Sequence, residues 1–104
     1  MALAEPSRTV VRLDKDLEPI VTRFLGRKRR EPPLLREALR SRDYETIRRL
    51  GHDLKGAGEG FGFPELSVIG AQLEGCARTR DADTITQQIE AMEAFLAAVE
   101  VHFS

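Results

Sequence analysis

Apolar residues recur at spacings of three and four along almost the whole chain, and this period is the feature that most constrains the fold. The spacing matches one face of an α-helix, which completes a turn in about 3.6 residues. We find no run of alternating apolar and polar residues, bounded by turn residues, that predicts a β-strand. The pattern therefore predicts an all-α protein.

The first apolar stripe runs from Leu13 to Leu25 and predicts a helix with Asp16 as its N-cap. Pro19 would then lie in the first turn, where its missing N–H costs no intrahelical hydrogen bond. The helix is expected to end in the run Arg27–Arg30, because positive charge suits a helix C-terminus. The expected inward residues are Leu13, Leu17, Ile20, Val21, Phe24 and Leu25. No aromatic residues are interleaved with the basic run, so a solvated helix end is favoured over a nucleic-acid surface.

Four further helices are predicted downstream. A short one covers Pro32–Leu39, and a longer one begins after the cap Asp43 and continues toward Gly58. Another starts at Pro64, and the last continues to Phe103. Their expected inward residues are Leu34, Leu35, Ala38 and Leu39; Ile47, Leu50 and Leu54; Leu66, Ile69, Leu73 and Ala77; and Ile85, Ile89, Met92, Leu96, Val99 and Phe103. Gly70 and Gly75 are expected to permit close helix packing, and His102 to be structural or merely exposed.

Four substantial amphipathic helices with short connections predict an antiparallel four-helix bundle, with an additional short helix near the N-terminal half. Residues 1–9 are small, polar and proline-containing, and are predicted to be a tail or a short capping segment. Residues 10–104 would form the bundle domain. One bundle can bury every stripe, so a monomer is expected, and the self-contained set of helices favours a free-standing protein over an excised domain.

The charges nearly cancel, with 16 basic and 17 acidic residues and a formal net charge of -1. This balance argues against a protein built to coat nucleic acid or anionic lipid, but leaves room for a local basic patch. The single cysteine, Cys76, cannot form an intramolecular disulfide and is expected to be a small core residue. No apolar run is long enough to span a bilayer and no secretory signal opens the chain, so a cytoplasmic protein is predicted.

The helix that begins at Tyr44 carries the candidate chemistry. At 100° per residue, one side of this helix groups His52 with Arg48, Arg49, Lys55, Gly56 and Glu59. A neutral imidazole is a nucleophile near neutral pH, because the ordinary histidine pKa is about 6.5. The ammonium of Lys55 would stabilise a transferring phosphoryl group. No nucleotide-binding loop is present, so the donor would be another protein; an ordinary surface histidine remains the alternative reading.

The stretch from His52 to Gly56, His-Asp-Leu-Lys-Gly, resembles the signature of the histidine-containing phosphotransfer (HPt) family. That signature is His-x-Leu-Lys-Gly, a glycine six residues later, a leucine and then Leu-Glu. The later positions match Gly62, Leu66, Leu73 and Glu74.

The resemblance implies a four-helix bundle with an exposed phosphorylated histidine. His52 matches the phospho-acceptor, Lys55 the basic residue beside the phosphoryl group, and Gly56 the small residue that leaves the histidine accessible. The implied partners are response-regulator receiver domains and sensor (hybrid) histidine kinases. The implied carrier has no cofactor of its own, since the receiver brings Mg²⁺, and it is not an autonomous enzyme.

A receiver is expected to dock on the His52 face, with Arg48 and Arg49 as cations and Glu59 and Phe61 at the edge. Two positions depart from the common pattern. Gly51 replaces a frequent alanine, at a cost of about 1 kcal/mol in helix propensity. The carboxylate of Glu59 would oppose a phosphoryl group. A non-transferring adaptor that docks receivers is the alternative function, and retention of His52 and Lys55 counts against it.

Overall fold

The structure is a computed structural model that describes residues 9–104. Within this range the chain forms β1 (Thr9–Leu13), a 3-10 helix η1 (Lys15–Leu17), α1 (Glu18–Lys28), α2 (Glu31–Arg40), α3 (Tyr44–Phe61), α4 (Pro64–Thr79), α5 (Ala82–Ala98) and β2 (Val99–Phe103). The predominantly helical prediction is confirmed. Residues 1–8 of the predicted tail lie outside the described residues, and Thr9, assigned to that tail, instead begins β1.

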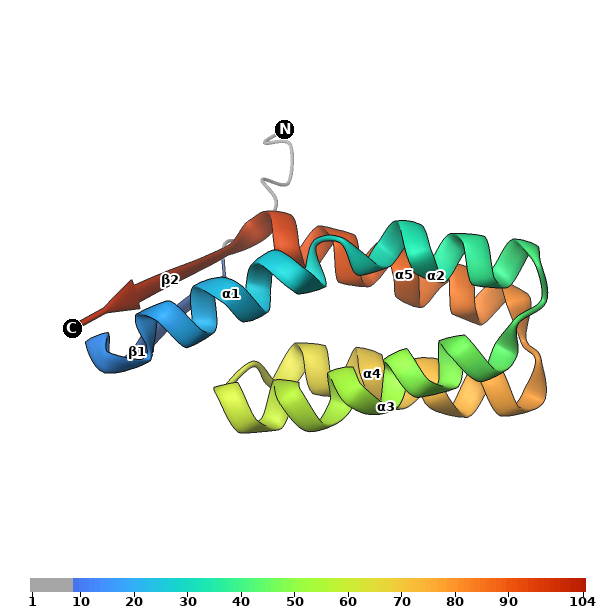
Figure 1. Cartoon of the computed structure of the whole chain (residues 1–104), viewed down its shortest axis with the longest axis horizontal. Coiled ribbons are helices and arrows are strands. Elements are labelled where there is room, and N and C mark those ends of the chain that lie inside the picture. The colour runs from blue at the N-terminus through green and yellow to red at the C-terminus, as the bar shows by residue number, and fades with distance from the viewer. Residues whose placement is uncertain (1–8) are drawn as a thin grey trace, which may run out of the picture.

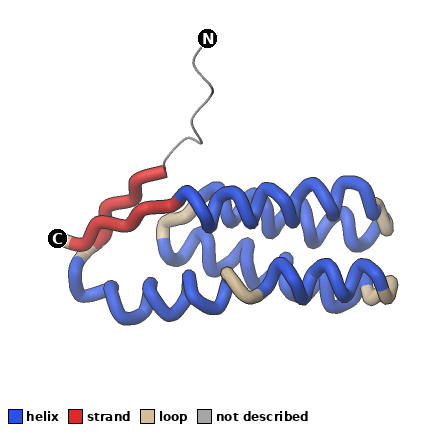
Figure 2. The backbone as a smooth tube through the Cα atoms, turned by 90° about the horizontal axis from the view of Figure 1, so that it is seen from above, coloured by secondary structure: helices blue, strands red, loops and turns tan. Residues whose placement is uncertain are grey.

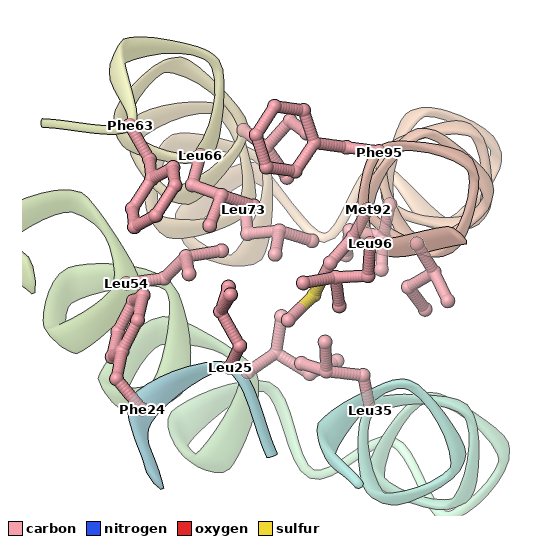
Figure 3. Packing of buried hydrophobic residues seen from close by; sticks show 14 of the residues in the cluster. Phe24, Leu25, Leu35, Leu54, Phe63, Leu66, Leu73, Met92, Phe95 and Leu96 are labelled. Atoms are coloured by element: carbon pink, nitrogen blue, oxygen red, sulfur yellow. The ribbon is translucent and has the colours of Figure 1, made fainter. Parts of the chain in front are cut away.

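All five α-helices of the described residues contribute side chains to one core. The closest pairing joins α3 and α4; α4 also packs on α5, α5 on α2, and α2 on α3. Figure 1 shows α1 and α2 following one another as a bent rod along one long side of the molecule, with α3 along the other. The two strands project from one end of the helices (Figure 2). Side chains from α1, α2, α3, α4 and α5 meet between the helices (Figure 3).

Glycines allow the backbones of α3 and α4 to touch. A Cβ atom on Gly70 would overlap the backbone nitrogen of Lys55 and lie 2.6 Å from the carbonyl oxygen of Gly51. One on Gly51 would lie 2.8 Å from the backbone nitrogen of Glu74. Gly58 makes the same kind of contact, since its Cβ would lie 2.6 Å from the backbone nitrogen of Ser67. These contacts pair rising residue numbers on α3 with falling numbers on α4.

The close-packing role predicted for Gly70 is therefore correct, but the same role for Gly75 is wrong. A Cβ on Gly75 would meet nothing within 4 Å, so this glycine faces open space. Gly51 was expected only to weaken its helix. The structure adds a reason for glycine there, because any larger residue would collide with α4.

The predicted helix starts are partly correct. The Asp43 carboxylate accepts a hydrogen bond from the backbone N–H of Thr46 at 3.1 Å and caps α3, as predicted. Asp16 is not the cap of α1. Instead, Asp14 accepts the backbone N–H of Asp16 at 2.8 Å at the start of η1, and α1 begins after Leu17. The 3-10 turn separates the two segments that the sequence pattern merged.

The prediction of no strands is wrong, and so is the prediction that the last helix continues to Phe103. β1 and β2 pair in parallel, from Thr9 opposite Val99 to Leu13 opposite Phe103. The C-terminal segment alternates side chains between two faces and is rich in β-branched valine, which favours a strand. Its partner lies at the other end of the described chain, so local periodicity could not reveal the pairing.

Several predicted inward positions are also wrong. Leu17, Ile20 and Leu34 are exposed, the last two by more than half. Leu50 is half-buried and packs against the core, as expected of an inward residue. Leu54 is buried, as predicted. Lys28, expected at a solvated helix end, is buried; its Nζ lies 3.1 Å from both carboxylate oxygens of Glu31.

A matched pair of substitutions tests the contact between α3 and α4. Gly70→Ala should lower the free energy of unfolding by about 1–3 kcal/mol, because the new methyl group forces the two backbones apart. Gly75→Ala, on the same helix, should raise it by about 0.5–1 kcal/mol through helix propensity alone. Urea denaturation of both variants measures the difference, and equal effects would contradict the close contact.

Candidate functional site

His52 lies on α3 with its side chain 64% exposed, next to the largely buried carboxylate of Glu74 from α4. The His52 Nδ1 and the Glu74 Oε2 are 2.9 Å apart. The glycine contact produces this proximity, because Gly51 packs directly against the backbone of Glu74 and precedes His52. The close packing of the two helices therefore fixes the position of the histidine partner.

Three positively charged or hydrogen-bonding groups surround the Glu74 carboxylate. Besides His52, the Nζ of Lys55 lies 4.0 Å from Oε1, and an Nη of Arg78 lies 3.7 Å from Oε2. The hydrogen bond with His52 holds the pKa of Glu74 below its ordinary value, although partial burial opposes this shift. The charges of Lys55 and Arg78 act in the same direction as the hydrogen bond. Glu74 is therefore ionised at neutral pH.

The ionised carboxylate determines which imidazole nitrogen carries the proton. A carboxylate can only accept hydrogen bonds, so the Nδ1–H of His52 is the donor to Glu74. In the neutral ring, Nε2 then holds the lone pair. Since the side chain is mostly exposed, Nε2 is the nitrogen available to an incoming electrophile.

The structure brings together the three residues predicted to perform the chemistry. Lys55 lies one turn after His52, with its side chain 46% exposed and its Nζ directed to the same carboxylate. Gly56 is exposed, and a Cβ atom there would meet nothing within 4 Å. A partner can therefore approach His52 over a low part of the α3 surface.

The four residues predicted to contact a partner lie in different settings. Arg48 is engaged by Glu45, with its Nη2 2.6 Å and its Nε 3.0 Å from the two carboxylate oxygens. Arg49 and Glu59 are exposed on α3. Phe61 is half-buried, and its ring centroid lies 4.7 Å from that of Phe24 in the core. The aromatic ring therefore packs inward and presents only part of its surface.

The sequence pattern assigns no role to two residues of the site, Glu74 and Arg78. Glu74 is predicted only as part of the Leu-Glu motif, and no sequence motif includes Arg78. A glutamate directly after the core residue Leu73 was a usable signal, because a charged residue beside the apolar stripe needs a partner. Arg78 follows Glu74 by four residues, the spacing at which two helical side chains meet.

The other candidates stand apart from this site. Cys76 is half-buried, and burial raises the pKa of its thiol. His102 is on β2, with its Nε2 3.6 Å from a carboxylate oxygen of Glu100. Among residues 9–104, no cluster of three histidine, cysteine, aspartate or glutamate side chains could hold a metal ion. In the same range, no helix is both long enough and apolar enough to cross a membrane.

The lowered pKa of Glu74 predicts a pH-dependent stability difference. Its ordinary pKa is 4.5 and the folded-state value is lower, so ionised Glu74 stabilises the fold above pH 4.5, and this contribution disappears as pH falls through the folded-state pKa. Glu74→Gln lacks the charge at every pH. The wild type should therefore have the higher Tm at pH 7, and the difference should shrink below pH 4.5. A difference that stays constant down to pH 3 would contradict this account.

Known proteins resemble this chain at the level of a protein family. Neither the curated proteins nor the solved structures contain a match to this sequence. The family model for the Hpt domain matches residues 20–102, which include both α3 and α4 and therefore the whole site. Hpt domains carry phosphoryl groups on histidine and interact with receiver domains and kinases in two-component phosphorelays. The family match agrees with the resemblance at His52–Glu74, and the chain belongs to the Hpt domain family.

Proposed function

We propose that this chain is a phosphorelay carrier. His52 accepts a phosphoryl group from the aspartyl phosphate of a receiver domain, or from a kinase, and passes it to another receiver. The observation that carries the proposal is the 2.9 Å hydrogen bond between His52 and Glu74, which leaves Nε2 as the nucleophile. The same proposal includes an antiparallel four-helix bundle that acts as a monomer and has no kinase activity of its own.

The transfer step begins with attack of the Nε2 lone pair on phosphorus. The bond between phosphorus and the aspartyl oxygen breaks, and the aspartate leaves as a carboxylate. The ring keeps its Nδ1–H and acquires positive charge as the phosphorus–nitrogen bond forms. Glu74 offsets this charge through the existing hydrogen bond, so the carboxylate favours the phosphorylated ring as well as the correct tautomer.

Lys55 and Arg78 supply positive charge from two different helices. Charge on the transferring phosphoryl group spreads over its three equatorial oxygens, and nearby cations lower the barrier. Both side chains lie beside Glu74 and are substantially exposed, so each is able to turn toward a phosphoryl group on Nε2. Mg²⁺, which the Hpt resemblance assigns to the receiver, completes the charge balance in the complex.

The receiver docks on the face of α3 that carries His52. Gly56 gives close access, while Arg49 offers positive charge to an acidic receiver surface and steers the encounter. Arg48 lies on the same face, where Glu45 holds its guanidinium in place. Glu59 lies at the edge of this face, and the exposed part of Phe61 contributes apolar area.

A pair of histidine substitutions tests the proposed acceptor. Wild-type protein incubated with a radiolabelled phosphorylated receiver should acquire the label, and His52→Gln should acquire none because glutamine offers no nucleophilic nitrogen. His102→Gln makes the same chemical change at the other histidine and should be labelled normally. Label on His52→Gln would refute the assignment. Receiver binding without label on the wild type would identify the adaptor alternative.

Substitutions at the two cations test charge stabilisation. Lys55→Ala and Arg78→Ala should each slow transfer at least about fivefold, since a unit charge 4 Å away is worth about 1 kcal/mol even in bulk water. Their unfolding free energies should change by no more than about 0.5 kcal/mol, as expected for surface sites. Lys15→Ala removes an exposed positive charge from η1 and serves as the control. Normal rates in both variants, with large losses of stability, would instead assign Lys55 and Arg78 to folding.

A further inference from the structure

A line of exposed residues follows the α1–α2 rod at alternating spacings of three and four. The stripe consists of Ile20, Arg23, Arg27, Arg30 and Leu34. Arg29 and Arg30 between the two helices keep right-handed helical dihedral angles, so the helical phase continues through the bend. Two apolar side chains, each more than half exposed, thus bracket three exposed arginines along one face.

The three arginines of this stripe are not paired with carboxylates of the described residues. Within residues 9–104, Arg23, Arg27 and Arg30 make no side-chain ion pair or hydrogen bond. The nearest carboxylates along α2 are already engaged, Glu31 by Lys28 and Glu37 by Arg40. The three guanidinium groups are therefore available to an external anion.

The nearly neutral total charge conceals an uneven distribution. Residues 18–40, which span α1 and α2, contain seven basic and three acidic residues. The segments of α4 and α5 contain five acidic residues and one basic residue. The molecule therefore has a charge dipole that would turn the α1–α2 rod toward an anionic surface.

The composition of the stripe indicates the kind of partner. It combines three exposed arginines with two aliphatic side chains that are each more than half exposed. Arginines that contact headgroups, together with aliphatic side chains that enter the acyl boundary, are the pattern of an interfacial helix.

We infer that the α1–α2 stripe binds the surface of an anionic lipid membrane, with the rod lying in the membrane plane. This association is additional to the proposed phosphotransfer. Figure 1 shows α3 on the opposite long side of the molecule from the rod, so His52 stays accessible while the stripe is engaged. The lipid contact would hold the carrier at a membrane without using its transfer site.

Flotation of the full chain with lipid vesicles tests this inference. The protein should bind vesicles that contain phosphatidylglycerol and phosphatidylcholine, and should not bind vesicles of phosphatidylcholine alone. Arg27→Gln should lower the partition coefficient about fivefold and weaken its salt dependence, since one interfacial contact is lost. Ile20→Ser should lower the partition coefficient at every salt concentration without changing that dependence, because it removes apolar contact only.

Arg49→Gln is the matched control, because it removes the same charge from an exposed position on α3. It should change vesicle binding less than Arg27→Gln does, and circular dichroism should show all variants folded. Equal losses at the two positions, or no binding to the anionic vesicles, would overturn the inference. Preferential binding to soluble polyglutamate would also overturn it, and would assign the stripe to an acidic protein partner.

Discussion

The backbone contact between α3 and α4 is the constraint on which the rest of the site depends. Gly51 and Gly70 place the two helices so close that a methyl group at either position would collide with the other backbone. This approach brings a glutamate of α4 to within 2.9 Å of a histidine of α3. Wider spacing would leave the carboxylate without its hydrogen bond, and the imidazole would lose the group that selects its tautomer. The same glycine contact therefore determines both the distance between α3 and α4 and the hydrogen bond of the histidine.

The balance of charge around Glu74 explains how a carboxylate can lie beside the proposed phosphoryl acceptor, His52. An isolated carboxylate would repel an incoming phosphoryl group, but here Lys55 and Arg78 flank it. Its side chain is 11% exposed, whereas the histidine is 64% exposed. The negative charge therefore lies behind the ring, on the Nδ1 side, and the approach to Nε2 is left to solvent and cations. Glu74, which orients the ring, is therefore buried, whereas Nε2 of His52 is exposed to solvent.

Much of this arrangement follows from the sequence, and the exceptions have physical causes. Periodicity predicts the helices and the buried position of Leu54, because amphipathic order is a local property. The pairing of Val99 with Thr9 joins distant parts of the chain, so no local pattern reveals it. The partnership of His52 with Glu74 likewise depends on how two helices approach, although the motif already contains both residues. Periodicity also predicts burial where there is none: Ile20 belongs to an apolar stripe but is exposed, because a residue at the edge of a stripe need not be covered by another helix.

Different interactions stabilise the two ends of the helices, and the site lies between these ends. At the end where α3 turns into α4, the rings of Phe61 and Phe63 pack against Phe24, with centroid distances of 4.7 Å and 6.0 Å from it. At the other end, Asp43 and Asp81 cap α3 and α5. His52 lies between these two ends, on α3, and the backbone of α3 is in contact with that of α4. The proposed acceptor is therefore preorganised, and the proposed transfer would require the approach of a partner rather than a rearrangement of this chain.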